Sequence, residues 1–244
     1  MRYVALGSSM AAGPGIPPRA AGSPFRAGRS GNNYPHLVAR QLGFDLVDVT
    51  YSGATTAHLL RDKQHGQPPQ LEALNGTEEL VTVTIGGNDV GYVPALTAAG
   101  MPRILRPRKL LDPDAREAEL DALPPKLAEV AAAVRTRAPK ARVLFVDYLT
   151  LLPPHGPASG LDPAHVELGR YIGDRLAEAT AEAAEASGCE IVRASRASRD
   201  HHPWSPSPWA NGPGLPLPGR PMPFHPNELG MRAVAELIAG HLRG

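Results

Sequence analysis

Two polar residues suited to acyl transfer follow apolar, strand-like runs of the sequence. Ser9 comes shortly after the run Tyr3–Leu6, and Asn88 comes shortly after the run Leu80–Ile85. Because open α/β sheets build their sites at the carboxyl ends of their strands, both side chains are expected at one edge of a sheet. There a serine hydroxyl can act as a nucleophile, and an asparagine amide can donate to an oxyanion. Taken singly, each segment is also typical of an ordinary turn.

A glycine and a histidine extend this set. Gly53 follows a further strand-like run, Leu46–Val49, and its backbone N–H can point into a cleft at the same edge. His225 stands directly before a helical pattern, and of the nine histidines it is the one best placed for chemistry. Taken singly, each of the nine histidines is more often structural than catalytic. Four weak motifs in order along the chain nevertheless form a stronger signal together.

Apolar runs alternate with helical patterns along most of the chain, which is typical of a parallel sheet covered by helices on both faces. The expected strands are Tyr3–Leu6, Leu46–Val49, Leu80–Ile85, Val143–Val146 and Glu190–Val192, and the expected helices are Tyr34–Leu42, Pro124–Ala138, Pro163–Ser187 and Asn227–His241. Two stretches rich in proline and glycine, Ala11–Asn32 and His201–Phe224, are expected to be long functional loops. The length of 244 residues suits one α/β domain, residues 1–244.

The net charge of +1 gives no overall field that would attract nucleic acid or an anionic membrane. A local exception is the segment 101–111, which carries Arg103, Arg106, Arg108 and Lys109 among apolar residues. We interpret it as a solvated loop, with a contact for lipid headgroups or a carrier protein as the alternative. No apolar run has the length of a membrane span. We expect a monomer that binds no nucleic acid and does not insert stably into a membrane.

Cys189 is the only cysteine, so no internal disulfide can form, and a buried, unreactive thiol is expected. The chain opens with Met1-Arg2 and enters its first strand at once, which leaves no room for a signal peptide. We therefore expect a cytoplasmic location, or a secreted one if the sequence is a trimmed mature form. Neither metal-ligand spacing nor a dinucleotide-binding fingerprint is present, so no metal and no cofactor are expected.

In order along the chain, these segments resemble the SGNH or GDSL hydrolases, which are named for a serine, a glycine, an asparagine and a histidine in four sequence blocks. The most specific parts of the resemblance are Gly86-Gly87-Asn88-Asp89 and His225-Pro226, and it extends from the first strand to the last helix. It implies a flavodoxin-like, three-layer α/β/α sandwich with a five-stranded parallel sheet. The implied activity is carboxylic ester hydrolysis of the esterase or lipase type.

The resemblance assigns a role to each residue of the set. It implies that Ser9 is the nucleophile and carries the acyl group, and that His225 is the base. It also implies that the oxyanion is held by the backbone N–H groups of Ser9 and Gly53 and by the side chain of Asn88.

Three departures from the family pattern bear on this assignment. Ser8 stands where the family usually has an aspartate, and it is a rival nucleophile. Met222 stands where the family usually places its triad acid, which implies a Ser-His dyad held by the Pro223 carbonyl, with Asp200 as an alternative acid. A carbonyl gives less charge stabilisation than a carboxylate, so we expect a histidine of lower basicity and a slower enzyme.

The third departure concerns disulfides and leads to the question of substrate. The chain resembles an actinobacterial secreted lipase and esterase branch that usually carries disulfides, whereas Cys189 has no partner, which agrees with a reducing compartment.

The side chains Trp204, Trp209, Met222 and Phe224 either line an acyl pocket or anchor the proline-rich loop. The expected substrate is a small-molecule or lipid ester. Alternatives are an acyltransferase or thioesterase that uses the same site, and a non-catalytic binding protein with the same fold.

Overall fold

The computed structural model describes residues 1–215 and 221–244 and contains a five-stranded parallel sheet. Its strands are β1 (Arg2–Gly7), β2 (Asp45–Asp48), β3 (Glu78–Thr84), β4 (Arg142–Val146) and β5 (Glu190–Val192). They lie in the order β2-β1-β3-β4-β5. All five expected strands are present, with ends that shift by one or two residues. This strand order reverses direction between β1 and β3, and doubly wound sheets bind their ligands at such a switch point.

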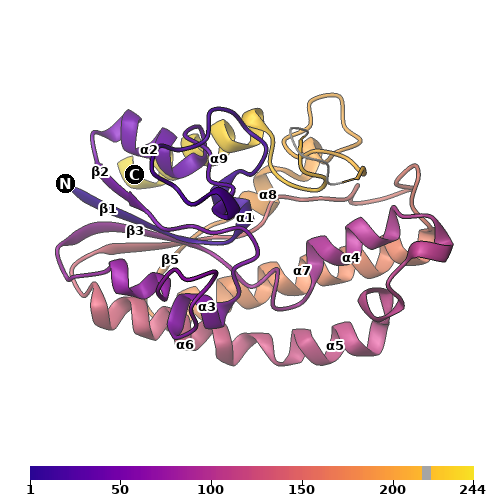
Figure 1. Cartoon of the computed structure of the whole chain (residues 1–244), viewed down its shortest axis with the longest axis horizontal. Helices are drawn as coiled ribbons and strands as arrows, with labels where there is room; N and C mark the ends of the chain where they lie inside the picture. Colours follow the sequence, from indigo (N-terminus) through magenta and orange to yellow (C-terminus); the bar gives the residue numbers. More distant parts are fainter. Residues whose placement is uncertain (216–220) are drawn as a thin grey trace.

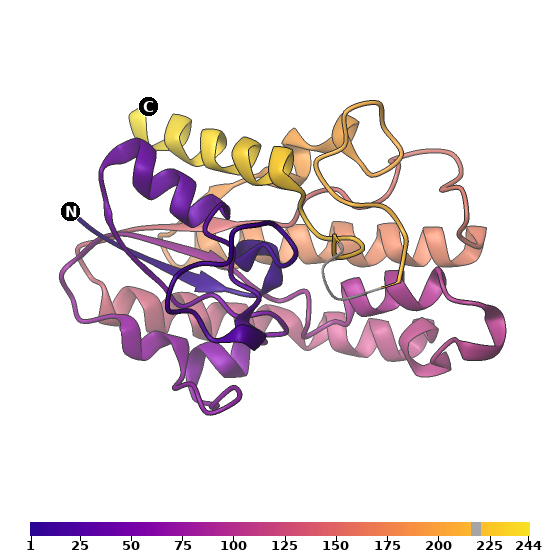
Figure 2. The same ribbon diagram turned by 45° about the horizontal axis from the view of Figure 1, so that its top comes forward.

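Helices cover both faces of the sheet, as expected (Figure 1). One face carries α2 (Tyr34–Leu42) and α9 (Glu228–Arg243), which lie side by side (Figure 2). The other face carries α3 (Thr56–Leu60), α4 (Tyr92–Ala99), α5 (Pro113–Asp121), α6 (Leu123–Arg137) and α7 (Pro163–Ala186). The short helices α1 (Ser9–Ala12) and α8 (Ala194–Ala197) follow β1 and β5. The chain thus has the three-layer, flavodoxin-like architecture of the SGNH hydrolases.

Strand β1 lies inside the sheet, where helices cover both of its faces, and it is apolar as such burial requires. Tyr3, Val4, Ala5 and Leu6 of β1 have no exposed surface. Three of the covering helices begin at a side-chain cap: the Asp162 side chain accepts from the second residue of α7, and the Asn33 and Asn227 side chains accept from the third residues of α2 and α9. Such caps and apolar faces explain why the four long helices are predicted to within one or two residues.

The sequence pattern does not predict α3, α4 or α5. Helix α4 is apolar on nearly every side and α5 buries only Arg116 and Leu120, so neither shows the periodic stripe of an amphipathic helix. The loop predicted at Ala11–Asn32 is confirmed, apart from the end of α1 and a short 3-10 turn at Phe25–Ala27. The second predicted loop, His201–Phe224, includes residues 216–220, which lie outside the described part of the chain. Cys189 is buried, as predicted.

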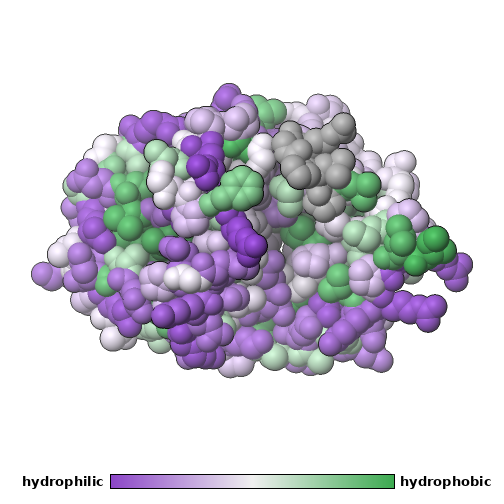
Figure 3. Space-filling model, in the orientation of Figure 1, coloured by the Kyte–Doolittle hydropathy of each residue, from purple (hydrophilic) through white to green (hydrophobic). Residues whose placement is uncertain are grey.

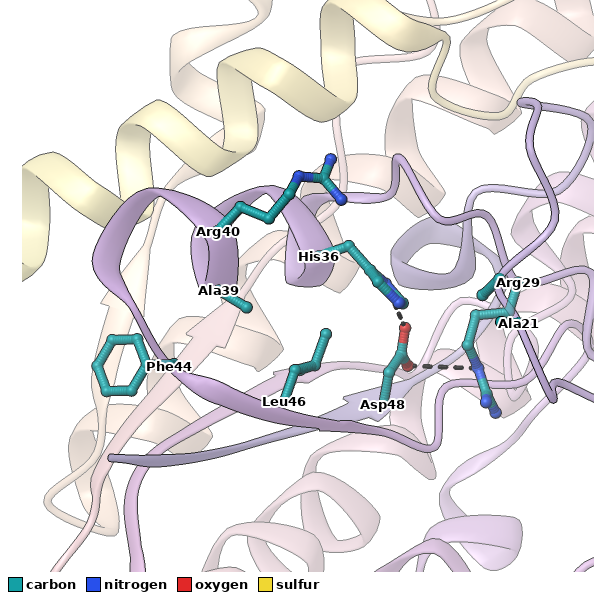
Figure 4. Close-up of a pocket in the computed structure, with 9 residues that line it drawn as sticks. Ala21, Arg29, His36, Ala39, Arg40, Phe44, Leu46 and Asp48 are labelled. Atoms are coloured by element: carbon teal, nitrogen blue, oxygen red, sulfur yellow. Dashed lines mark ion pairs between the residues drawn. The ribbon is translucent and has the colours of Figure 1, made fainter.

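A polar network at the end of β2 holds the first long loop in place. The Asp48 carboxylate lies 3.4 Å from Nε of Arg29 and 3.4 Å from Nδ1 of His36 (Figure 4). The Asn33 side chain donates to Asp48 at 2.8 Å and to the Ala12 carbonyl at 3.3 Å. These contacts join α1 and the loop to β2. The cavity of about 430 Å³ in Figure 4 is lined by this network and contains none of the predicted site residues.

Candidate active site

Ser9 is the first residue of α1 and follows the tight turn at the end of β1. The preceding Gly7 has a φ of 149°, which favours glycine, and a Cβ there would lie 2.5 Å from the Thr84 carbonyl oxygen. The Gln70 side chain accepts from the Gly7 N–H at 2.7 Å and donates to the Gly7 carbonyl at 3.0 Å. Ser9 itself is 7% exposed. Contacts of Gly7 with Thr84 and Gln70 therefore fix the end of β1. The turn that follows brings the Ser9 hydroxyl to the carboxyl edge of the sheet.

His225 reaches Ser9 from the segment that precedes α9. Its Nε2 lies 2.8 Å from Oγ of Ser9, and its Nδ1 lies 2.8 Å from the Pro223 carbonyl oxygen. A carbonyl oxygen only accepts hydrogen bonds, so Nδ1 carries the ring proton and Nε2 is free to accept from the serine hydroxyl. Within the described chain, His225 pairs with no carboxylate, and Asp200 makes no hydrogen bond to it. Asp200 instead lies in an exposed turn, where its charge acts on His202.

The backbone around His225 is fixed by the end of the long loop. Asn211 accepts from the Phe224 N–H at 3.1 Å, and its own N–H donates to the His225 carbonyl at 2.9 Å. The Asn211 side chain also donates to the Met222 carbonyl at 3.1 Å. Phe224 has a φ of 56°, a left-handed conformation that costs energy for an aromatic residue. This strained turn, next to a predicted catalytic residue, aims the imidazole at Ser9.

Burial lowers the pKa of His225 below its ordinary value of 6.5, and the Pro223 carbonyl opposes part of this shift. A base must be neutral to act, so activity is lost as the pH falls through this lowered pKa. We therefore expect the acidic limb of the profile of kcat/KM against pH to lie below pH 6.5. The measurement is hydrolysis of a soluble chromogenic ester across pH. An acidic limb above that value would show that a carboxylate partner, rather than burial, controls the imidazole.

Two further loops carry the other predicted oxyanion donors, Gly53 and Asn88. Gly53, which follows β2, has a φ of 79°, and its N–H makes no hydrogen bond within the described chain. Asn88, which follows β3, donates from its side chain to the Ala54 carbonyl at 2.8 Å. Because Ser9 is the first residue of α1, its own N–H has no partner in that helix. The bond from Asn88 to Ala54 joins the two loops and uses one of the two amide hydrogens.

Asp89 connects the same two loops at a second point. Its carboxylate accepts from the Thr56 N–H at 3.0 Å and from the Thr56 hydroxyl at 2.6 Å. A carboxylate that accepts from the N-terminal turn of α3 also stabilises the start of that helix. The Gly53 loop and the Asn88 loop are therefore held as one unit.

Tyr148, two residues after the end of β4, connects the Ser9 loop with the Asn88 loop. Its hydroxyl lies 2.8 Å from Oγ of Ser8 and accepts from the Gly87 N–H at 3.2 Å. Burial raises the pKa of Tyr148 to about 12, so the hydroxyl stays protonated. A Cβ on Gly87 would lie 2.3 Å from the tyrosine ring, which explains the glycine. Ser8 is fully buried in this contact, which leaves it badly placed to be a nucleophile.

We expect the substitution Tyr148→Phe to lower kcat about tenfold with little change in KM, since the loops that carry Ser9 and Asn88 lose their shared partner. It also leaves the Gly87 N–H and the Ser8 hydroxyl unpaired, at about 1–3 kcal/mol of stability for each group. Steady-state kinetics and chemical unfolding measure the two effects. The matched control is Tyr92→Phe, because Tyr92 is buried beside Tyr148 but makes no side-chain hydrogen bond within the described chain. Equal effects of the two substitutions would contradict the positioning role.

The aromatic residues of the long loop pack against the protein. Phe224 is fully buried, and Trp204 lies tilted against it and donates from Nε1 to the Ser159 carbonyl. Trp209 stacks on His201 with a centroid distance of 4.2 Å. These contacts favour the interpretation that the aromatic residues anchor the loop. Met222 keeps part of its side chain accessible and stays a candidate for a substrate contact.

Sequence reasoning missed Gln70, Asp89 and Tyr148 as parts of this arrangement. Asp89 adjoins the predicted Asn88, and Tyr148 follows a predicted strand, so the rule that sites gather at strand ends could have found both. Gln70 carries no such signal, because it lies in a 3-10 turn far from any motif. A cavity of about 560 Å³ on the α7 side of Tyr148 contains neither Ser9 nor His225.

A serine and a histidine lie in hydrogen-bond contact at the switch point of a β2-β1-β3-β4-β5 parallel sheet, which is the arrangement expected for a protein of the SGNH type. Comparison with known proteins agrees. The model of the GDSL-like lipase/acylhydrolase family matches residues 5–233. Lipase 2 of Streptomyces coelicolor is 37% identical over an alignment of 246 positions, which covers 96% of this chain and 83% of that protein.

Two solved structures from Streptomyces resemble the whole chain. Phospholipase A1 from Streptomyces albidoflavus NA297 superposes with a TM-score of 0.82 at 26% identity and covers 99% of this chain and 98% of its own. An extracellular lipase from Streptomyces rimosus superposes with a TM-score of 0.83 at 26% identity and covers 98% of both chains. The chain belongs to the GDSL-like lipase/acylhydrolase family and is an ester hydrolase.

Proposed function

We propose that the chain hydrolyses carboxylic esters through an acyl-enzyme on Ser9, with His225 as the only general base. The observation that carries the proposal is the hydrogen-bonded series from Ser9 through the imidazole to the Pro223 carbonyl. Gly53 and Asn88, on the loops after β2 and β3, are the proposed oxyanion donors besides the Ser9 N–H. A nucleophile, its base and a group that orients the base are the parts that acyl transfer requires.

In the first half of the reaction, Oγ of Ser9 attacks the ester carbonyl carbon while Nε2 of His225 takes the hydroxyl proton. The carbonyl oxygen becomes an oxyanion that accepts from the N–H groups of Ser9 and Gly53 and from the Asn88 amide. When the tetrahedral intermediate collapses, the carbon–oxygen bond to the alcohol breaks, and His225 gives its proton to the leaving alkoxide. In the second half, His225 takes a proton from a water that attacks the acyl-enzyme carbonyl carbon. When this second tetrahedral intermediate collapses, the carbon–Oγ bond breaks, His225 returns the proton to Oγ of Ser9, and the carboxylic acid leaves.

The Pro223 carbonyl fixes the tautomer and the plane of the imidazole, but it carries only a partial charge. We therefore propose a Ser-His dyad with no catalytic carboxylate. The substitution Asp200→Asn should leave kcat within about twofold of wild type, because Asp200 does not contact the ring. A loss of a hundredfold or more would make Asp200 the acid of a triad.

Lipid and small-molecule carboxylic esters are the proposed substrate class. The relatives that span most of the chain are named lipase and phospholipase A1, which supports an ester with an apolar acyl group. The test is a series of p-nitrophenyl esters from acetate to palmitate, with Ser9→Ala as the blank. A maximum of kcat/KM within the series supports the proposal and measures the acyl site. No turnover above the blank on any ester would refute it.

Acyl transfer to an alcohol or thiol uses the same acyl-enzyme and is the second candidate. Competition between water and an added alcohol, followed by product analysis, separates the two reactions. Free acid as the main product at high alcohol concentration supports hydrolysis, whereas a dominant transesterified product would favour the transferase.

We further propose that the protein is cytoplasmic, that it is a monomer, and that residues 1–244 form one domain. The single cysteine supports a reducing compartment, while the Streptomyces rimosus relative is named an extracellular lipase. In the part of the chain that the structure describes, no helix is long and apolar enough to cross a membrane. Cell fractionation tests the compartment, and light scattering of the purified protein tests the monomer.

A further inference from the structure

The segment 101–111, between α4 and α5, projects from the end of the molecule at which these helices lie (Figure 1). It consists of two 3-10 turns, Arg103–Leu105 and Arg108–Leu111, neither of which has a buried residue. Ile104 is 92% exposed and Leu105 is 65% exposed. Two adjacent large apolar side chains in water are unfavourable unless something covers them.

Basic residues surround this apolar tip. Arg103, Arg108 and Lys109 are exposed, and Arg106 donates from Nε to the Met101 carbonyl at 2.7 Å. The segment contains no acidic residue, and since the whole chain carries a net charge of only +1, the remainder is net negative. In Figure 3, hydrophobic and hydrophilic groups meet at this end of the molecule. The four cations of the segment lie within five residues of the exposed isoleucine and leucine, and the exposed carboxylates of Asp112 and Asp114 follow where α5 begins.

The base of the segment is firmly attached to the part of the protein that carries Asn88. The buried Arg116 of α5 donates to the Val90 carbonyl at 2.9 Å, and Leu110 packs toward Gly91. At the other end of α4, Gly100 lies against Leu161 and Pro213. Helix α4 has eight residues, so it places the segment about 12 Å beyond the Asn88 loop. The tip thus has a fixed position relative to the proposed catalytic centre.

We infer that the segment 101–111 docks the enzyme on an anionic phospholipid surface, with Ile104 and Leu105 inserted among the acyl chains and the four cations against the headgroups. Apolar insertion with basic flanks is the pattern of interfacial binding, and each basic residue near an anionic surface adds about fivefold in affinity. A nucleic acid would leave the two apolar side chains uncovered.

The test measures sedimentation of the protein with lipid vesicles, either of phosphatidylcholine alone or of phosphatidylcholine mixed with phosphatidylglycerol. The Ser9→Ala background prevents lipid hydrolysis and keeps this test separate from the proposed esterase function. We expect binding to the mixed vesicles that weakens with salt, and weaker binding to phosphatidylcholine alone. The variant Ile104→Ser with Leu105→Ser should bind at least tenfold less. The variant Arg103→Gln, Arg108→Gln and Lys109→Gln should lose about a hundredfold.

Matched controls alter the same residue types elsewhere on the surface. Leu229→Ser removes a half-exposed leucine from α9, and Lys140→Gln, Arg196→Gln and Arg243→Gln remove three exposed cations. These variants should bind vesicles within twofold of the parent. In the active background, the segment variants should hydrolyse a soluble short-chain ester at the wild-type rate, which shows that they are folded.

Three results would overturn the inference. The first is equal vesicle binding by the parent and both segment variants, and the second is no binding to either vesicle. The third is a concentration-dependent dimer that Ile104→Ser with Leu105→Ser abolishes, since a second copy would then be the occupant of the tip. Absence of esterase activity in the wild type would refute the proposed function and leave the vesicle result intact.

Discussion

The substitution Ser9→Ala is expected to lower kcat for ester hydrolysis by at least about a thousandfold and to leave the fold intact. The reason is that the acyl-enzyme cannot form without the hydroxyl that lies 2.8 Å from Nε2 of His225. His225→Ala should cause a loss of similar size, and the double variant should lose little more, because the two residues act as one unit. Steady-state hydrolysis of a soluble chromogenic ester measures all three.

Ser8→Ala is the control for this prediction, since it removes a hydroxyl from the neighbouring position. The Ser8 hydroxyl is buried against Tyr148, so its loss should weaken positioning and keep at least about a tenth of the activity. The opposite ranking, with Ser8→Ala inactive and Ser9→Ala active, would move the nucleophile to Ser8.

The second large effect is expected at Asn88. The substitution Asn88→Ala should lower kcat by about 100- to 1000-fold with little change in KM, because an oxyanion donor acts mainly in the transition state. Asn88→Asp should be at least as damaging, since it keeps the shape but places a negative charge beside the oxyanion. The measurement is kcat and KM for the best ester of the series.

Two measurements, the unfolding free energy and the separate values of kcat and KM, distinguish this role from a structural one. Asn88 also donates to the Ala54 carbonyl, so the unfolding free energy of each variant has to be measured beside its kinetics. If Asn88→Ala raises KM and leaves kcat unchanged, the side chain binds the substrate in its ground state and does not stabilise the oxyanion.

The architecture could be predicted because its signals are local. Each strand of the sheet is a short apolar run, and helices such as α7 carry a cap, an apolar stripe and a stop within their own sequence. The helices α4 and α5, which escaped prediction, lack the apolar stripe: α4 is apolar all round, and α5 has the cap Asp112 but buries only Arg116 and Leu120. Their positions depend on tertiary contacts such as the bond from Arg116 to the Val90 carbonyl.

At the proposed site, the residues that stand in sequence motifs could be predicted. The residues that hold them in position could not. Ser9, Gly53, Asn88 and His225 stand in recognisable sequence blocks, and the Pro223 carbonyl was predicted from the missing acid at Met222. The contacts of Tyr148 and Gln70 with the Ser9 turn join residues far apart in the chain, so no local pattern shows them. Phe224 is fully buried and has a left-handed backbone, and the sequence indicates neither.

Covalent labelling of the nucleophile tests the central claim most directly. Treatment with diethyl p-nitrophenyl phosphate, followed by peptide mass spectrometry, shows which hydroxyl attacks an electrophilic ester. The account predicts one diethylphosphoryl group on Ser9 in the wild type, formed as activity disappears, and almost none in His225→Ala. A label on Ser8 or another residue, or loss of activity without any label on Ser9, would contradict it.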